Sequence, residues 1–319
     1  MTFLGKLFLP IIRFIDSDYF PEGADTLRNL PDRFEWQRAI PFVFLHLGCL
    51  GVLWTGWSWT AVAIAAVLYF VRMFAVTAIY HRYFCHRAYQ TSRVTQFLFA
   101  LFGLTAMQRG PLWWASVHRH HHAHSDDEHD IHSPGMQGFL WAHIGWLTSS
   151  RNFPTDYRRV KDLTKFPELV FLNRFDVLGP VLLLVVLYAL GAFMEAYAPV
   201  LNTSGAQLVI WGFFISTTVL FHATCFVNSL AHCFGKQRFN NEDDSRNSLL
   251  LALITLGEGW HNNHHQYQAA ARQGFYWWEI DISYYIIRFM GLIGIVWNIK
   301  SVPDAVYEKA VTRQTADAK

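Results

Sequence analysis

Charged residues are scarce in this sequence. Asp, Glu, Lys and Arg make up 16% of its 319 residues, whereas a soluble globular domain usually carries about 25%. Apolar residues account for 52%, and the mean hydropathy is +0.16. This composition indicates a membrane protein. The net charge of +2 is too small to favour a nucleic acid as partner.

Motifs that would mark an internal redox domain are also missing. The chain has no Gly-x-Gly-x-x-Gly fingerprint, no cysteine cluster for an iron–sulfur centre and no cytochrome b5-like haem extension. Its four cysteines show neither metal-binding spacing nor the pattern of a disulfide framework. No linker, internal repeat or low-complexity segment divides the chain, so we expect residues 1–319 to form a single domain.

Four apolar segments are long enough to cross a bilayer. A spanning helix needs roughly 17–25 mostly apolar residues, because each residue adds about 1.5 Å across a core about 30 Å thick. The segments cover residues 39–57, 60–80, 177–194 and 206–227, and Arg72 is their one charged residue. Short connections predict two helical hairpins. Three shorter apolar runs, at 94–107, 249–256 and 286–297, are expected to pack in a core or lie at the membrane interface.

Basic residues avoid the tips of both hairpins. No Lys or Arg lies between Arg38 and Arg72, or between Arg174 and Lys236. By the positive-inside rule, the basic side of such a protein is cytoplasmic. We therefore expect both termini on that side, together with a helical cap formed by residues 81–176 and 232–303. The predicted fold class is an all-α membrane protein with four transmembrane helices under a cytoplasmic cap.

Histidine is abundant, and nine of the sixteen histidines fall into four clusters. Residues at i, i+3 and i+4 share one helix face, so each His-x-x-His-His run aims three imidazoles at one side. Asn228 and His232 align in the same way, whereas the five-residue spacing of the first pair suits a helix end. The clusters are His81 with His86, His118 with His121 and His122, His232 alone, and His261 with His264 and His265.

Two His-x-x-His-His runs in one chain predict metal binding. A single histidine on an apolar face is usually a hydrogen-bonded core residue, and this accounts for His46, His143 and His222. It does not account for the repeated runs. Nine imidazoles exceed the needs of one ion, so two ions are expected. Imidazole binds zinc, copper, iron and nickel alike, so the ligands alone do not select the metal.

These clusters resemble those of the membrane fatty acid desaturases, in particular the group of acyl-CoA and acyl-lipid Δ9 desaturases, with the bacterial acyl-lipid members most similar. The three clusters that begin at His81, His118 and His261, which we call boxes, and the Asn228–His232 pair match in type, order and spacing. The resemblance extends from about the second span to Pro303. The resemblance implies that the nine histidines hold two iron ions, and that Asn228 reaches one of them through a water. It also implies O2-dependent insertion of a cis double bond, at Δ9, into a saturated acyl chain.

Several residues near the boxes are candidates for supporting roles. Asp130 and Glu258 are candidates for orienting the metal-binding imidazoles, although either could equally be a solvated surface acid. The run Asp126-Asp127-Glu128 is expected to be a solvated turn. Four further histidines are expected beside the metal centre or at the surface rather than on a metal: His120, His124, His129 and His132, the last in an Asp-x-His tract that the family shares.

A desaturase must hold its substrate in a narrow apolar tunnel. Trp114, four residues before His118, and Trp260 are candidates for the tunnel wall, and the alternative is an interfacial aromatic belt. Acyl-CoA members of the family commonly read Trp-x-Arg-Asp-His at the second box. This chain has Ser116 and Val117 at the two charged positions, which favours an acyl lipid, with acyl-CoA close behind.

The electrons must come from a separate carrier, of the ferredoxin or cytochrome b5 type with its reductase. A basic stretch would suit such a carrier, or equally anionic lipid; it comprises Arg151, Arg158, Arg159, Lys161 and Lys165. The resemblance places the protein in a bacterial inner membrane. Two other functions stay open. One is a membrane di-iron hydroxylase or ketolase, and the other is a non-catalytic metal-binding or transport protein.

Overall fold

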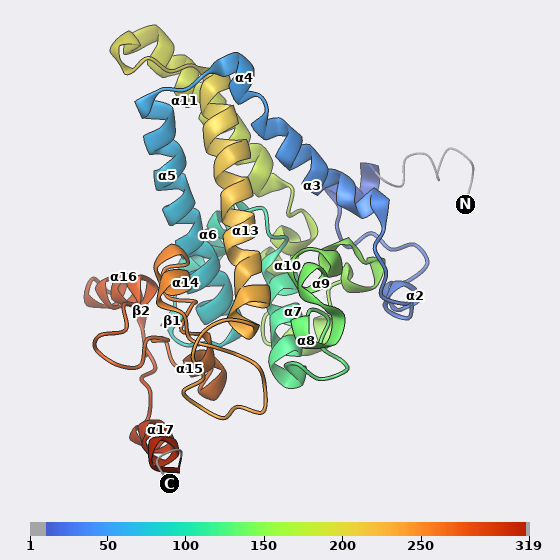
Figure 1. Ribbon diagram of the computed structural model, residues 1–319. Helices are drawn as coiled ribbons and strands as arrows, with labels where there is room; N and C mark the ends of the chain where they lie inside the picture. Colours follow the sequence, from blue (N-terminus) through green and yellow to red (C-terminus); the bar gives the residue numbers. More distant parts are fainter. Residues whose placement is uncertain (1–10, 317–319) are drawn as a thin grey trace.

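The computed structural model describes residues 11–316, and the described chain is mostly helical. Four long helical segments project from a broader base, which we call the cap (residues 86–177 and 233–316; Figure 1). The segments cover Trp36–Thr55, Trp59–Cys85, Leu178–Tyr197 and Gly205–His232, and each is long and apolar enough to cross a bilayer. The prediction of four spans is confirmed.

The second and fourth spans reach further into the cap than predicted. The first span is α3 (Trp36–Cys49) with α4 (Val52–Thr55), and the second is α5 (Trp59–Phe74) continued by the π-helix η1 (Ala75–Cys85). The third is α11 (Leu178–Tyr197), and η5 (Pro199–Leu201) follows it. The fourth joins α12 (Gly205–Leu208), the π-helix η6 (Val209–Ile215), α13 (Ser216–Ser229) and η7 (Leu230–His232). This extension places His81 and His232 inside continuous helical segments.

Residues 75–85 are wound as a π-helix, in which a backbone N–H bonds to the carbonyl five residues earlier. The N–H of His86, for example, donates to the carbonyl oxygen of His81 across 3.3 Å. Residues five apart therefore face the same way, and the spacing of this histidine pair fits the winding. The expected helix end is present, since His86 is the C-terminal cap of η1, but the sequence did not reveal the π-helix.

Arg72, the charged residue of the second span, is buried between spans. Its guanidinium donates to the hydroxyls of Thr217 and Ser216, both at 2.7 Å, and to three backbone carbonyl oxygens. These five bonds use every N–H group that an arginine side chain offers. The charge is thus stabilised by dipoles, and the contacts connect the second span to the fourth.

The cap is built from short helices and one two-stranded sheet. The sheet pairs β1 (Gln90–Thr91) antiparallel with β2 (Val296–Trp297), Gln90 opposite Trp297. The cap helices are α6 (Arg93–Leu104), α7 (Pro111–His124), α8 (Pro134–Gln137), α9 (Phe139–His143), η2 (Gly145–Thr148), η3 (Ser150–Asn152), η4 (Tyr157–Val160), α10 (Pro167–Arg174), α14 (Leu249–Ile254), α15 (His261–Gln266), α16 (Ile282–Leu292) and α17 (Asp304–Ala316), and α2 (Ala24–Arg28) precedes the first span.

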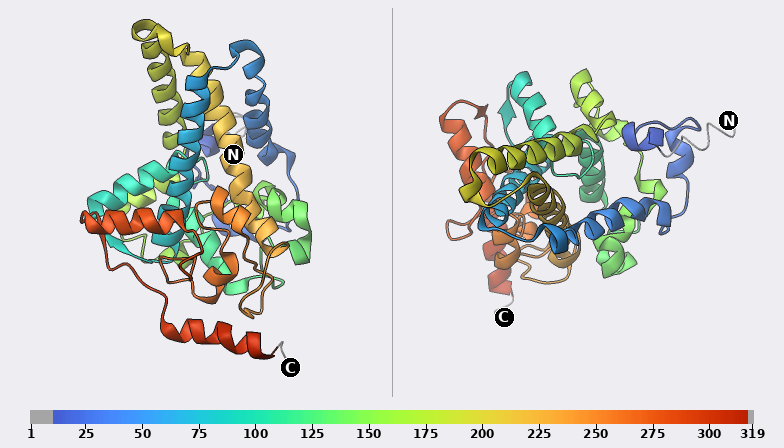
Figure 2. Two further views of the ribbon diagram at one scale, coloured as in Figure 1. Left: turned by 60° about the vertical axis from the view of Figure 1, so that its left-hand side comes forward. Right: turned by 90° about the horizontal axis from the view of Figure 1, so that it is seen from above.

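Two of the shorter apolar runs form amphipathic helices at the foot of the spans. In the left view of Figure 2, α6 and α16 run across the direction of the spans. Each exposes apolar side chains, such as Val94 on α6 and Leu292 on α16. Helices of this kind lie in the membrane interface with the apolar face toward the lipid, and for α6 and α16 this location stays a prediction.

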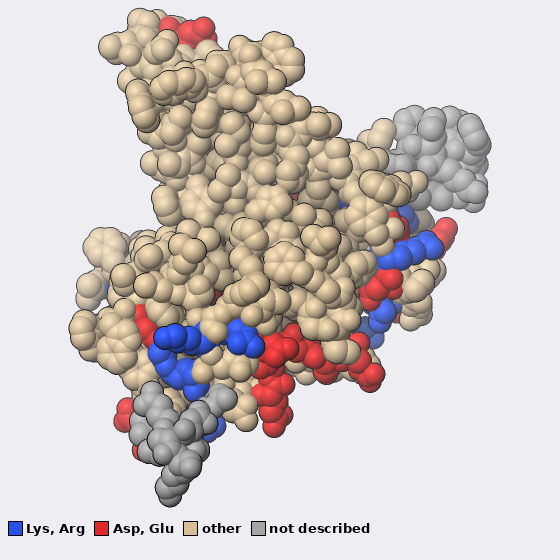
Figure 3. Space-filling view, in the orientation of Figure 1, with Lys and Arg blue, Asp and Glu red and all other residues tan. Residues whose placement is uncertain are grey.

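Charge is distributed as the sequence predicts. Figure 3 shows the surface of the spans almost free of Lys, Arg, Asp and Glu, apart from an acidic residue at the tip, whereas both signs gather on the cap. The largest buried cluster lies where the second span enters the cap and includes Tyr80 and Phe84 of η1, Leu104 of α6 and Leu112 of α7. This cluster holds the histidine-bearing segments η1 and α7 against each other.

Candidate metal centre

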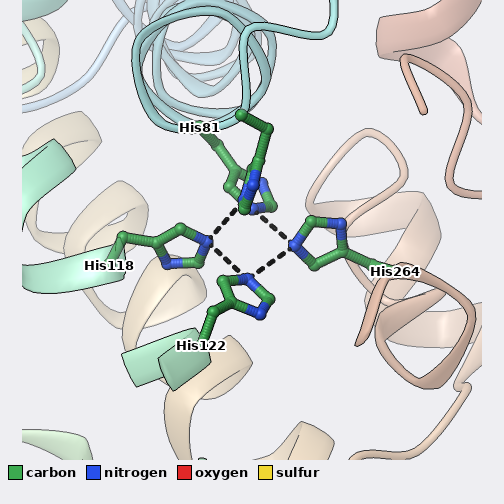
Figure 4. A group of neighbouring side chains, drawn as sticks. His81, His118, His122 and His264 are labelled. Atoms are coloured by element: carbon green, nitrogen blue, oxygen red, sulfur yellow. Dashed lines mark hydrogen bonds between the residues drawn. The ribbon is translucent and has the colours of Figure 1, made fainter. Parts of the chain in front are cut away.

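Five imidazoles converge where the second span enters the cap. His81 and His86 come from the end of η1, His118 and His122 from α7, and His264 from α15. Figure 4 shows four of these rings pointing at a common centre. Their Nε2 atoms form a series of contacts of 2.9 Å each, from His81 through His264, His122 and His118 to His86. We call this set the five-histidine group.

Four further imidazoles lie directly beside the first set. Nε2 of His261 is 3.0 Å from Nε2 of His232 and 3.1 Å from Nε2 of His265, and His121 completes the set. Within each of the two sets, the ligand nitrogens all lie within 4.8 Å of one another. The ring centroids of His122 and His265, one from each set, are 4.5 Å apart. We call this second set the four-histidine group.

Each His-x-x-His-His run contributes to both groups. On α7, His118 and His122 belong to the five-histidine group and His121 to the four-histidine group. On α15 the division is reversed, with one residue in the first group and two in the second. The two helices therefore flank both positions. The sequence predicted that the three imidazoles of a run share a side, but not that they divide between two groups.

The convergence of these rings suits a cation. Nδ1 of His81 contacts a carboxylate oxygen of Glu258, and a carboxylate only accepts, so the proton lies on Nδ1 and the lone pair on Nε2 faces the group. The same reasoning applies to His121, His232 and His265, whose Nδ1 atoms also contact carboxylates. Such lone pairs repel one another unless a cation lies between them. The residues present therefore fit a metal ion in each group.

Burial keeps most of these rings neutral, the form that binds metal. It lowers the pKa of His265 to about 4, against the opposing effect of Asp243. His121 behaves differently, because the negative charge of Asp130 raises its pKa although burial alone would lower it. The pKa of the remaining rings outside the spans is held well below the usual value, mainly by burial; these are His86, His118, His122, His261 and His264.

Both acids that the sequence nominated contact a ring. Oδ2 of Asp130 accepts from Nδ1 of His121 at 3.0 Å, and Oε2 of Glu258 accepts from Nδ1 of His81. Asp130 and Glu258 are both buried, so neither is the solvated surface acid of the alternative interpretation. A carboxylate in this place fixes the tautomer and the orientation of the imidazole.

Two more aspartates accept a hydrogen bond from Nδ1 of an imidazole, and the sequence did not reveal them. Oδ2 of Asp126 accepts from Nδ1 of His232, and Oδ2 of Asp243 accepts from Nδ1 of His265, each at 2.7 Å. The expected solvated turn is correct for the exposed Asp127 and Glu128 but wrong for Asp126. The partners of the two aspartates lie 106 and 22 residues away in the chain, so no local motif marks them.

The remaining candidates lie around the two groups. His132 is buried with its ring centroid 4.5 Å from that of His121. His124 pairs with Asp127 at the surface, and His120 contacts the carbonyl of His129. Asn228 lies in the last turn of α13, one turn before His232, and its water-mediated contact with a metal stays a prediction.

The two tryptophans of the predicted tunnel wall differ in their surroundings. The ring of Trp114 stacks on His118 with centroids 5.1 Å apart, and its centroid is 5.8 Å from that of His81. Its Nε1 donates to Gln108. Trp260 is buried, and its Nε1 donates to a backbone carbonyl just before α16, at 2.8 Å. Trp114 is thus placed against the five-histidine group, and Trp260 connects α15 to the α16 segment.

Three histidines expected to be hydrogen-bonded core residues form a chain of their own. Nε2 of His46 in the first span lies 2.8 Å from Nε2 of His222 in the fourth. Nδ1 of His222 lies 3.0 Å from Nε2 of His143 on α9, whose Nδ1 is 2.9 Å from the hydroxyl of Ser229. Because His222 uses both nitrogens, the arrangement is linear. It connects two spans to the cap, which the sequence did not reveal.

Comparison with known proteins agrees with this geometry. Residues 57–288, which include all nine histidines of the two groups, match the sequence profile of the fatty acid desaturase family. The chain is 33% identical to an acyl-CoA 5-desaturase of Anemone leveillei, over 93% of this chain and 92% of that protein. It is 34% identical to an sn-1 stearoyl-lipid 9-desaturase of Anabaena variabilis, over 84% and 94%. It is 35% identical to the Delta-9 acyl-lipid desaturase 1 of Arabidopsis thaliana, over 84% of each chain.

Proposed function

The chain belongs to the fatty acid desaturase family, an enzyme family of oxidoreductases, and from this premise we propose its specific reaction. It is an O2-dependent desaturase that inserts a cis double bond, at Δ9, into a saturated acyl chain of a membrane lipid. Two iron ions are held by the nine histidines, and one of them is also reached by Asn228 through a water. The observation that carries the proposal is the convergence of the nine imidazoles into two adjoining groups, in which five of the residues are buried and four are partly buried.

A bound di-iron centre supplies, with O2 and two electrons, an oxidant strong enough to remove hydrogen from an unactivated methylene group. The chain's own residues place the substrate. Trp114 stacks on His118 and is held through Gln108, whose Nε2 donates to the hydroxyl of Thr224 on the fourth span at 2.8 Å. A tryptophan fixed in this way can form a rigid wall beside the five-histidine group, with Trp260 at the N-terminal cap of α15.

The head group is proposed to be that of an acyl lipid. Ser116 is buried and its hydroxyl bonds to the carbonyl of Trp113, so the second box offers no charged residue to a soluble carrier at this position. The relatives named as stearoyl-lipid and acyl-lipid 9-desaturases support this choice and the Δ9 position. The relative named as an acyl-CoA 5-desaturase supports the alternative head group.

Electrons are proposed to come from a separate ferredoxin or cytochrome b5, with its reductase. A pocket of about 380 Å³ exposes His86 and His122 of the five-histidine group, with Arg119 and Gln268 also lining it. The basic stretch suggested by the sequence is a weaker candidate for docking. Arg158 and Arg159 both pair with Asp156, and Arg151 pairs with Asp32, which leaves Lys161 and Lys165 exposed.

The proposed location is a bacterial inner membrane, with both termini and the histidine groups on the cytoplasmic side. The charged cap and the absence of Lys and Arg from the hairpin tips support this orientation. Residues 1–319 are proposed to form one membrane desaturase domain.

The test is the fatty-acid profile of membranes from a host that expresses the chain and has a competent electron carrier, with double bonds located by mass spectrometry. The wild-type chain should give a new cis-alkenoic acid. His264→Ala should abolish it, whereas His124→Ala, which alters a surface histidine of the same region, should not. Hydroxylated chains would favour the hydroxylase alternative. Metal binding without any product, at verified iron loading, would refute the desaturase proposal and favour a non-catalytic metal-binding protein.

A further inference from the structure

The Nδ1 atoms of the histidines have different hydrogen-bond partners in the two groups. In the four-histidine group, three of the four rings donate from Nδ1 to an aspartate. The pairs are His121–Asp130 at 3.0 Å, His232–Asp126 at 2.7 Å and His265–Asp243 at 2.7 Å. In the five-histidine group, His81 is the one ring among the described residues whose Nδ1 contacts a carboxylate, that of Glu258.

The single carboxylate behind the five-histidine group is paired with a cation. Oε1 of Glu258 lies 3.2 Å from Nη2 of Arg82, and both side chains are buried. Arg82 also pairs with Asp281, so one guanidinium is shared by two buried carboxylates. The carboxylate behind this group therefore has a cationic partner, although it shares that partner with Asp281.

The three aspartates behind the four-histidine group have no such compensation. Among the residues that the structure describes, no Lys or Arg lies within ion-pair distance of Asp126, Asp130 or Asp243. Their remaining contacts are neutral donors, such as the hydroxyl of Ser133 on Asp126 at 2.7 Å and the backbone N–H of Ser245 on Asp243 at 3.0 Å. Three negative charges thus stand directly behind one metal position.

This difference affects how tightly each position binds a metal ion and which oxidation state of the metal it favours. A carboxylate that accepts from Nδ1 makes the imidazole a stronger electron donor, and loss of one such partner typically costs 10–100-fold in metal affinity. Negative charge near a metal also stabilises its more highly charged oxidation state. Both effects act mainly on the four-histidine group, although it has one imidazole fewer.

We propose that Asp126, Asp130 and Asp243 make the two metal positions unequal, so that the four-histidine group holds its iron more tightly and takes the ferric charge when one electron is removed. The inference rests on the proposed di-iron function. The aspartates are positioning residues, because each acts through an imidazole.

The first test is a chelator titration of the purified, anaerobic ferrous protein loaded with two iron ions, in which the iron that remains bound is measured. The wild-type protein should release its ions in two transitions. Asp243→Asn should move the tighter transition alone, by about 10–100-fold, and Glu258→Gln should move the weaker one alone. Asp127→Asn, a change at an exposed neighbouring acid, should move neither. Asp126→Asn acts on a different ring of the same group and should reproduce the effect of Asp243→Asn. A single transition, or an Asp243→Asn effect on the weaker one, would overturn the inference.

The second test is Mössbauer spectroscopy of the ⁵⁷Fe-loaded ferrous protein after one equivalent of ferricyanide, which accepts one electron and leaves one ferric and one ferrous ion. The ferric signal should change in Asp243→Asn and not in Glu258→Gln, and the reverse pattern would contradict the assignment. Product formation is measured separately. A protein that shows two transitions but makes no alkene would refute the desaturase proposal alone, and an active protein with one transition would refute only this inference.

Discussion

Nη1 of Arg82 lies 2.9 Å from Oδ1 of Asp281, and both side chains are shielded from solvent. Arg82 follows His81 in the second span, whereas Asp281 precedes α16 far along the chain, so the pair joins the span to the last part of the cap. Nη2 of Arg82 also contacts Glu258, the carboxylate that holds His81. One guanidinium therefore anchors both the fold of the cap and the orientation of a ring in the five-histidine group.

We predict that Arg82→Met lowers the free energy of unfolding by about 3–5 kcal/mol, because it leaves two buried carboxylates without a cation. Thermal unfolding of the protein in lipid nanodiscs would measure the effect. Arg87→Met is the matched control, because its partner Asp162 is 40% exposed, and such pairs contribute about 1 kcal/mol or less. Equal losses in the two variants would contradict the prediction.

Gly259 lies two residues before His261 at a point where the backbone is closely packed. A Cβ at this position would lie 2.0 Å from the backbone nitrogen of Ala252 and 2.5 Å from the carbonyl oxygen of Ser248. We predict that Gly259→Ala displaces α15 from α14, lowers stability by about 1–3 kcal/mol and reduces iron content after loading. Gly135→Ala, whose nearest contact would be 3.4 Å, should leave the iron content unchanged.

Removal of the Trp114 side chain should allow the acyl chain of the substrate to bind at more than one position along the site. We predict that Trp114→Ala yields double bonds at more than one position and a lower total of unsaturated product, because a rigid surface beside His118 is lost. Mass-spectrometric location of the double bonds measures this. Trp277→Ala removes an indole that is 82% exposed and serves as the control. A single bond position in both variants would show that Trp114 does not set the register.

The metal-free protein should lose stability as the pH falls below about 6.5. Burial lowers the pKa of six candidate ligands: His86, His118, His122, His261, His264 and His265. Below the ordinary pKa of about 6.5, the unfolded chain takes up protons that the folded rings refuse. Each ring then costs the folded state up to about 1.4 kcal/mol per pH unit. His121, with a raised pKa, contributes the opposite sign, but it is one ring against six.

Melting temperatures of the metal-free protein between pH 7.5 and 5.5 test this expectation. The midpoint should fall steadily toward the acidic end. A constant or rising midpoint would show that these rings are not held neutral in the folded state.

The sequence alone determined the spans and the presence of the histidine boxes. Both are local properties: a span is recorded in the apolar composition of about 20 consecutive residues, and the boxes are recorded in the i, i+3, i+4 spacing of a helix face. Asp130 and Glu258 could be nominated because each lies within ten residues of a box.

Only the tertiary structure decided how those parts combine. The division of each box between two groups depends on where α7 and α15 lie relative to η1 and η7, which no local pattern records. Asp126 resembles its exposed neighbour Asp127 in the sequence and differs because it meets His232, 106 residues away. Local sequence determines which side chains a helix presents, whereas the choice of partner depends on packing between distant segments, and that packing places three uncompensated aspartates behind one metal position.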